Sequence, residues 1–201
     1  MAGCLLIATR NAGKLAEFKA MPTPLGVRIF GLADFPGAPI PEEIGDSFEE
    51  NAVAKARSAA KYSGFLSLAD DSGLEVEALG GEPGVRSARF AGAGASDLAN
   101  NQLLLRRLAG IPPEQRLARF VAVLALAWPD GRTRTFRGEA RGWILSEPRG
   151  LYGFGYDPLF FSDDLGMSFA EAGARAKGRI SHRGRALARL LEGGRSLFVN
   201  S

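Results

Sequence analysis

The sequence predicts an α/β protein with a mixed, largely antiparallel twisted sheet, flanked by helices and divided into two lobes with a cleft between them. Three observations lead to this prediction. The chain has 201 residues, 46% hydrophobic and 23% charged, enough to bury the core of one large domain or two joined lobes. Short apolar runs alternate with segments of helical spacing. A long apolar run at 117–128 turns at Pro129-Asp130-Gly131 into an alternating run at 132–140, which is typical of an antiparallel pair.

The chain opens with a predicted strand, helix, strand and loop. Residues 4–9 are an apolar run that suits a buried strand, and residues 12–21 follow with helical spacing. Residues 26–32 suit a second strand, and the proline-rich stretch 36–41 suits a loop.

A capping box marks the start of the next helix. Ser47 and Glu50 have the spacing of this motif, and Gly64 is a typical residue at a helix end. Small residues on adjacent turns of this helix allow close packing, namely Ala52, Ala56, Ala59 and Ala60.

Beyond Gly64 the pattern predicts mostly strands, with two further helices. The turn-forming residues at 70–73 predict a tight turn between two of the strands. The predicted strands are 65–69, 74–79, 117–128, 132–140 and 159–161. Ser96 and Ser181 are expected to cap the two helices, whereas residues 80–95 are expected to be irregular. Because no clean linker separates these elements, residues 1–201 are expected to form a single domain.

Composition and motifs exclude several classes of protein. The longest apolar run, residues 120–128, is about half the roughly 18 residues that a membrane-spanning helix needs. Gly13-Lys14 lacks the earlier glycine and the following hydroxyl residue of a P-loop. His182 is the only histidine, which disfavours a zinc site and a serine hydrolase. With one cysteine and no leader segment, the protein is expected in the cytoplasm and not in a membrane.

Charge is distributed unevenly along the chain. Residues 1–100 contain 9 Lys or Arg against 13 Asp or Glu, whereas residues 101–201 contain 16 against 9. The acidic cluster comprises Glu42, Glu43, Asp46, Glu49 and Glu50, and the basic cluster comprises Arg175, Lys177, Arg179, Arg183, Arg185 and Arg189. The acidic cluster suits a metal ion and the basic cluster suits phosphate, although charge alone also fits two solvated helix faces.

Polar residues follow the first predicted strand at the point where a helix begins. They are Thr9, Arg10, Asn11, Ala12, Gly13 and Lys14. A hydroxyl, an amide, backbone N–H groups and an ammonium at a helix start suit a phosphate group. The same segment equally suits an ordinary helix cap with a surface lysine.

Two adjacent carboxylates, Asp70 and Asp71, follow the strand at 65–69. If the strand continued through them, their side chains would point to opposite sides, so both could not do the same job. One could hold Mg²⁺ or act as a base while the other orients a neighbour, or both could simply be turn residues. Glu43 and Asp71 could together hold phosphate-bound Mg²⁺ if the fold joins them.

The segment Gly153-Phe154-Gly155-Tyr156-Asp157-Pro158 combines flexible backbone, aromatic rings and a carboxylate. Stacking on Phe154 would bind any base, and hydrogen bonds from the backbone, Asp157 or Arg183 would add selectivity. A tight turn with buried aromatic residues is the alternative interpretation.

Taken together, motifs spread over nearly the whole chain resemble the inosine triphosphate pyrophosphatase family. They are Thr9-x-Asn11-x-x-Lys14, Asp70-Asp71-Ser72-Gly73, Phe154-Gly155-Tyr156-Asp157-Pro158 and Ser181-His182-Arg183-Gly184. The match also includes Glu43-Ile44-Gly45 with Phe48, Glu50, Asn51, Ala52 and Lys55, and Gly80-Gly81 through Ser87-Ala88-Arg89. Each motif is modest alone, but their order makes the resemblance specific. It implies a two-lobed domain with an active-site cleft, in which Mg²⁺-dependent attack of water on the α-phosphorus of ITP, dITP or XTP yields a monophosphate and pyrophosphate.

The resemblance also implies roles for individual residues. Asp71 is the expected proton acceptor and a metal ligand, and Glu43 is the second acidic residue at the metal. The expected phosphate-binding residues are Thr9, Arg10, Asn11, Ala12, Gly13, Lys14 and Ser72. The expected nucleotide and base pocket comprises Phe154, Gly155, Tyr156, Asp157, Lys177, His182 and Arg183. A homodimer is expected because family members usually form one.

Two other functions remain open at the level of sequence. One is a related pyrophosphatase acting on modified pyrimidine nucleotides, which base preference would distinguish. The other is a nucleic-acid-binding protein, suggested by the sequence pI of about 9.3 and the basic cluster. The second leaves Asp71 and Glu43 unexplained, so no stable nucleic-acid partner is expected.

Overall fold

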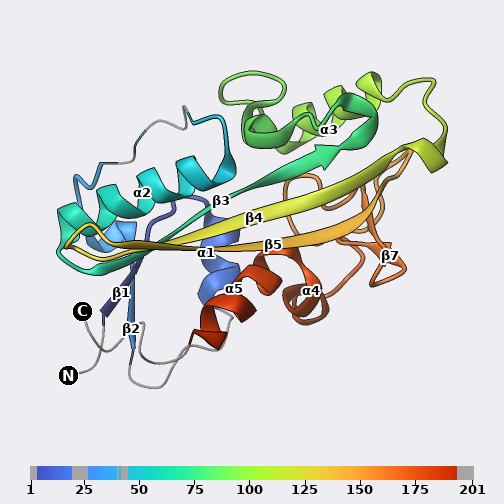
Figure 1. Cartoon of the computed structure of the whole chain (residues 1–201). Helices are drawn as coiled ribbons and strands as arrows, with labels where there is room; N and C mark the ends of the chain where they lie inside the picture. The colour runs from blue at the N-terminus through green and yellow to red at the C-terminus, as the bar shows by residue number, and fades with distance from the viewer. Residues whose placement is uncertain (1–3, 20–26, 40, 42–44, 194–201) are drawn as a thin grey trace. The chain divides into compact units, whose positions relative to one another are not determined.

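A computed structural model describes residues 4–19, 27–39, 41 and 45–193 (Figure 1). Within this part of the chain, seven strands form one sheet in the order β2-β1-β3-β4-β5-β6-β7. The strands are β1 (Cys4–Ile7), β2 (Arg28–Gly31), β3 (Leu66–Val76), β4 (Leu117–Ala127), β5 (Thr133–Ile144), β6 (Phe160–Ser162) and β7 (Met167–Ser168). β1 pairs in parallel with β2 and β3, whereas β5, β6 and β7 pair antiparallel. The mixed, mostly antiparallel sheet confirms the predicted fold class.

Helices flank this sheet. The α-helices are α1 (Ala12–Lys19), α2 (Phe48–Ser63), α3 (Asp97–Arg107), α4 (Ala174–Ile180) and α5 (His182–Glu192). Short 3-10 helices are η1 (Leu32–Asp34), η2 (Glu77–Leu79), η3 (Gly84–Arg89) and η4 (Pro113–Gln115). No helix in the described ranges is both long enough and apolar enough to cross a membrane.

The chain divides into two compact units. The first unit comprises Met1–Asp71, Ala122–Arg137 and Ala186–Ser201, and the second comprises Ser72–Val121 and Gly138–Arg185. The predicted cleft and the single-domain assignment stay predictions.

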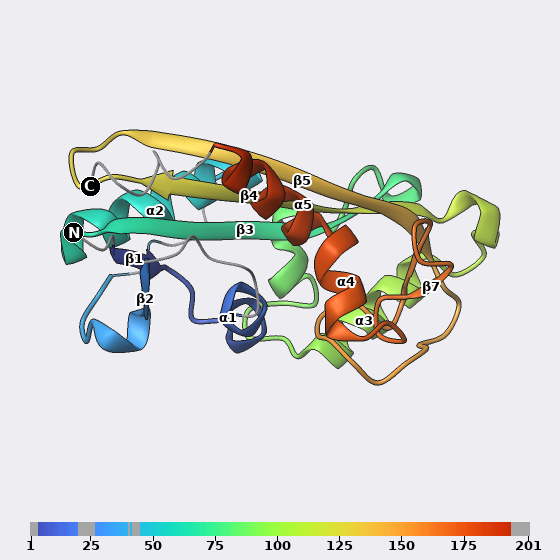
Figure 2. The same ribbon diagram turned by 90° about the horizontal axis from the view of Figure 1, so that it is seen from below.

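The core of the first unit lies on both faces of β1, β3 and β4. Figures 1 and 2 show α2 on one face of these strands and α1 and α5 on the other. Residues 120–127 of β4 are all buried, which explains why this strand reads as a continuous apolar run. The cluster toward α1 and α5 includes Leu5, Phe18, Leu66, Leu68, Leu124, Leu126, Trp128 and Leu190.

Helix α2 begins and ends where the sequence predicts. Ser47 accepts a hydrogen bond from the Glu50 backbone N–H, and the Glu50 side chain accepts from the Ser47 N–H, which completes the capping box. At the other end Gly64 has φ +71°, a left-handed conformation that favours glycine. The four alanines at 52, 56, 59 and 60 are buried, so their small size lets the helix approach the sheet closely.

The second unit has its own core. Helix α3 begins after Ser96, which accepts a hydrogen bond from Ala99 N, and it buries Leu104. Phe120, Phe160 and Phe169 form an aromatic group with ring centroids 4.8 to 5.8 Å apart.

The prediction for residues 65–79 is wrong in two respects. Residues 77–79 form the 3-10 helix η2 and not the end of a strand. Residues 70–73 do not form a turn, because β3 runs without a break from Leu66 to Val76. Turn-forming residue types predict a break, but each aspartate has a lysine partner that allows its charge to stay in a buried strand. In addition, α4 and β7 have no counterpart among the predicted elements, and β5 extends beyond residue 140 to Ile144.

Candidate active site

The segment after β1 forms a well-defined start to α1. Thr9 Oγ1 accepts a hydrogen bond from Asn11 N at 3.1 Å, and Asn11 Oδ1 accepts one from Lys14 N at 2.9 Å. Arg10, Asn11 and Ala12 are exposed, and Gly13 is half-buried. The predicted helix cap is therefore present, and its open backbone is compatible with the predicted phosphate contact.

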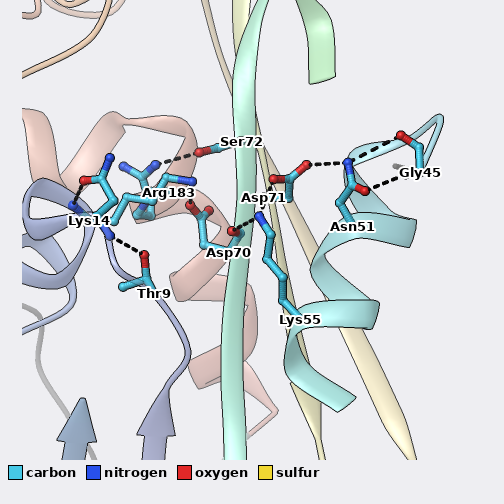
Figure 3. A network of polar contacts seen from close by, with 10 residues as sticks. Thr9, Lys14, Gly45, Asn51, Lys55, Asp70, Asp71, Ser72 and Arg183 are labelled. Carbon is cyan, nitrogen blue, oxygen red and sulfur yellow. Dashed lines mark hydrogen bonds and ion pairs between the residues drawn. The ribbon is translucent and has the colours of Figure 1, made fainter. Parts of the chain in front are cut away.

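Asp70 and Asp71 lie on opposite sides of β3, as alternation along a continuous strand requires (Figure 3). Lys14 Nζ lies 2.6 Å from Asp70 Oδ2. Lys55 Nζ lies 2.7 Å from Asp71 Oδ1. The two carboxylates therefore have separate surroundings, each with its own lysine, and the division of roles between them stays a prediction.

Helix α2 holds Asp71 through two side chains one turn apart. Asn51 Nδ2 donates to Asp71 Oδ2 at 3.2 Å, and Lys55 Nζ donates to Oδ1 (Figure 3). Both residues are buried on the same helix as Ala52 and Ala56. From sequence they entered only as part of the family resemblance, without a role. The sequence feature that could have revealed them is an amide and a lysine on the helix face that carries the alanines, where polar side chains are rarely buried without a partner.

Asn51 also holds Gly45, the residue at which the described chain resumes before α2. Its Oδ1 accepts from Gly45 N at 2.9 Å, and a Cβ at Gly45 would lie 2.8 Å from the same oxygen. Glycine is therefore required for this approach. Glu43, the predicted second metal ligand, lies outside the described residues.

The donor set fits a magnesium ion carried by a polyphosphate. In the part of the chain that the structure describes, no three His, Cys, Asp or Glu side chains gather into a metal site. However, Mg²⁺ bound with phosphates needs only one or two carboxylates, because phosphate and water oxygens complete its coordination. Asp71 is a carboxylate that could serve as such a ligand, on a strand that holds it in place.

In the second unit, an ion pair joins α4 to residues 153–158, the segment predicted to bind the base and here called the base loop. Asp157 Oδ2 accepts from Phe154 N at 2.9 Å and lies 2.5 Å from Lys177 Nζ. A Cβ at Gly153 would lie only 2.1 Å from the same oxygen, so this position requires glycine. Lys177 Nζ lies 5.1 Å from the centre of the Phe154 ring, within the range of a cation–π contact.

Arg183 joins the same group of residues. Its guanidinium donates to Ser72 Oγ at 2.8 Å and lies 5.9 Å from the centre of the Phe154 ring. The side chain is only 1% exposed, which is unusual for arginine and indicates a specific role. The structure therefore brings together four residues that the sequence assigns to one pocket, Phe154, Asp157, Lys177 and Arg183. It also places Ser72, which the sequence assigns to the phosphates, against Arg183.

His182 and Tyr156 have other neighbours. The imidazole of His182 is buried and stacks on Phe120, with ring centroids 4.7 Å apart. The Tyr156 hydroxyl donates to the Ser87 carbonyl at 2.9 Å, and burial raises the pKa of this phenol well above its ordinary value. Tyr156 therefore holds the loop from its buried side, whereas His182 packs against the aromatic core of the second unit.

Comparison with known proteins places this arrangement in a family. The Ham1 family model matches residues 5–193. The chain belongs to the Ham1 family. A dITP/XTP pyrophosphatase of Exiguobacterium sibiricum is 53% identical over 186 residues, covering 92% of this chain and 94% of the relative. A dITP/XTP pyrophosphatase of Thermus thermophilus is 52% identical over 188 residues, covering 94% and 90%.

Solved structures of Ham1 proteins share the fold. A Ham1 protein from Coxiella burnetii has a TM-score of 0.86 at 39% identity, covering 94% of this chain and 97% of that one. A nucleoside-triphosphatase / dITP/XTP pyrophosphatase from Mycobacterium abscessus has a TM-score of 0.76 at 44% identity, covering 94% and 98%. The resemblance seen in the sequence motifs is confirmed at the level of family and fold.

Proposed function

We propose that this Ham1 protein hydrolyses the non-standard purine nucleoside triphosphates ITP, dITP and XTP at the α-phosphorus, giving the monophosphate and pyrophosphate. Such an enzyme removes deaminated purines from the nucleotide pool. The observation that carries the proposal is the buried carboxylate of Asp71, held by Lys55 and Asn51 at 2.7 and 3.2 Å. Relatives about half identical to this chain are named dITP/XTP pyrophosphatase, which gives the substrate class.

The first unit would supply the groups that act on the phosphates. Thr9 to Lys14 offer backbone N–H groups and an ammonium, which bind the negative oxygens and orient the chain of phosphates. Asp71 acts as the proton acceptor for the attacking water, because a carboxylate fixed on both oxygens keeps one orientation. We propose that Asp71 and Glu43 hold Mg²⁺, which when bound neutralises the charge that develops on the phosphates.

The second unit would recognise the base. Phe154 offers a ring for stacking, with Lys177 and Arg183 close to it at 5.1 and 5.9 Å. Hypoxanthine and xanthine carry a 6-oxo group that accepts a hydrogen bond, whereas adenine carries a 6-amino donor. A donor such as Arg183 or His182 near position 6 would leave adenine mismatched.

The same geometry argues against nucleic-acid binding through the basic cluster. Lys177 and Arg183 are 5% and 1% exposed, so they do not belong to a solvated basic face. Arg185 is paired with Asp164 at 2.9 Å.

By resemblance to the family, we also propose that the enzyme is a homodimer. Its single cysteine is consistent with the reducing cytoplasm.

The test is pyrophosphate release from ITP, XTP, dITP, GTP, ATP and dUTP, with and without Mg²⁺. We expect turnover of the first three with Mg²⁺ and at least about a hundredfold loss in Asp71→Asn, which removes the proton acceptor. Asp130→Asn removes an exposed carboxylate from the same unit and should keep wild-type turnover. Turnover of dUTP alone would favour the pyrimidine enzyme, and no turnover of any nucleotide would contradict the proposal.

A further inference from the structure

Helix α3 carries no residue of the proposed site, yet two of its side chains hold the backbone of the base loop. Gly155 N donates to Asp97 Oδ2 at 2.6 Å, and Gly155 O accepts from Asn101 Nδ2 at 3.0 Å. The backbone N–H and the carbonyl oxygen of Gly155 are thus both hydrogen-bonded to side chains of the same helix. All three residues belong to the second unit.

The spacing of the two side chains on α3 makes this contact possible. Asp97 and Asn101 are four residues apart, which places them on the same helix face, one turn from each other. Gly155 has φ +62°, a conformation that other residues adopt only with strain. Helix α3 therefore holds a left-handed residue between Phe154 and Tyr156.

The N-cap of α3 is Ser96 and neither Asp97 nor Asn101. Ser96 already caps α3 by accepting from Ala99 N at 3.2 Å. The Oδ1 atom of Asn101 is buried, and no donor in the described ranges bonds to it. The side-chain hydrogen bond that Asn101 makes is therefore the one from Nδ2 to Gly155 O. This absence of a capping role for the pair points to a function in the loop.

The adjacent Phe154 ring is the part of the loop that such a clamp would orient. Phe154 is half-buried, and its ring lies near two buried cations, Lys177 and Arg183. Its backbone N–H is bound by Asp157 at 2.9 Å. With Gly155 fixed on the following side, the ring has a defined direction before any ligand binds, which lowers the entropy cost of stacking.

We propose that Asp97 and Asn101 are positioning residues that orient Phe154 for the purine base and thereby set the affinity and selectivity for that base. This inference rests on the proposed function. The two residues act through Gly155 and do not touch the base themselves. Their loss should raise KM for ITP and reduce its preference over ATP, with a smaller effect on kcat, because the phosphate-binding groups are untouched.

The experiment compares kcat and KM for ITP and ATP in wild-type protein and four variants, by pyrophosphate release with Mg²⁺. Asp97→Ala removes the acceptor for Gly155 N, and Asp97→Asn keeps an oxygen acceptor there. Ser96→Ala is the matched control, since it weakens the same end of α3 without touching Gly155. We expect Asp97→Ala to raise KM for ITP about tenfold and to lower the ITP preference, the scale of one lost charge-assisted hydrogen bond.

A second variant guards against a change in folding. Asn101→Leu keeps a similar volume, removes the donor to Gly155 O and buries no new polar atom, so it should fold and show the same rise in KM. Asp97→Asn and Ser96→Ala should keep near wild-type KM and preference. Hydrogen exchange of the Gly155 amide, measured by NMR without nucleotide, should be faster in Asp97→Ala than in Ser96→Ala.

The outcomes separate this inference from the proposed function. If wild-type protein turns over ITP while Asp97→Ala and Asn101→Leu keep its KM and its preference over ATP, the clamp has no role in base recognition. An equal loss in Ser96→Ala would likewise overturn it, because helix stability would then explain the effect. If wild-type protein turns over neither ITP nor XTP, the proposed function fails, and this inference fails with it.

Discussion

Two neighbouring aspartates have different chemical surroundings because of one strand. Alternation along β3 sends Asp70 toward Lys14 and Asp71 toward Lys55 and Asn51 (Figure 3). Both carboxylates are buried, at 3% and 4% exposure, so each needs a partner that offsets the loss of water. The separation gives each carboxylate its own lysine partner, which is the arrangement that the proposed function uses.

The Lys55 and Asp71 pair should behave as a coupled unit. Lys55→Met leaves Asp71 buried without its cation and should lower the free energy of unfolding by about 3 kcal/mol. The double variant Lys55→Met/Asp71→Asn should be less destabilised than the sum of the single variants, with a coupling of about 1 to 3 kcal/mol. Urea unfolding of all four proteins measures this cycle. Lys61→Met, at an exposed position of the same helix, is the control and should change little. Strict additivity would contradict the pairing.

At the scale of elements, α2 both completes the core of the first unit and carries part of the candidate site. Its buried alanines bring the helix close to the sheet, and this close approach lets Asn51 and Lys55 reach Asp71. The position of the helix start matters for the same reason, since Asn51 lies four residues after Ser47 and also holds Gly45.

The cap of α2 should contribute measurably to stability. Ser47→Ala removes the acceptor for Glu50 N and leaves that donor without its intrahelical partner. We expect a loss of about 1 kcal/mol in the free energy of unfolding. Thermal or urea unfolding followed by circular dichroism would measure it. Arg57→Ala, at an exposed position in the middle of the same helix, is the control. A loss as large in the control as in Ser47→Ala would argue against a specific capping effect.

At the scale of the whole molecule, the two units share three strands. β3, β4 and β5 each contribute residues to both units, so neither unit contains a complete sheet of its own. The two tryptophans report on different units, because Trp128 packs in the first core and Trp143 stacks on Phe161 in the second, 4.2 Å between ring centroids. The protein therefore carries a natural probe in each unit.

Shared strands predict that both units unfold together. In Trp128→Phe the remaining fluorescence reports the second unit, and in Trp143→Phe it reports the first. In each variant we expect the urea curve from fluorescence to coincide with the curve from far-ultraviolet circular dichroism, as in a two-state transition. Separated midpoints in either variant would show that one unit unfolds independently.

Local patterns in the sequence determined much of the architecture. The capping box of α2, its glycine end, and the hairpin of β4 and β5 depend on residues close together in the chain, so their signals are complete in a short window. The family motifs likewise pointed to Ser72, Phe154, Asp157, Lys177 and Arg183, which the fold gathers within the second unit.

Tertiary structure alone decided how these residues are held. The turn predicted at 70–73 is a strand, because Lys14 and Lys55 arrive from two helices to stabilise charges that the local sequence would place at the surface. Asn51, Asp97 and Asn101 act on residues 20, 58 and 54 positions away in the chain. No local pattern encodes such contacts, since they exist only once the sheet and its helices have brought distant segments together.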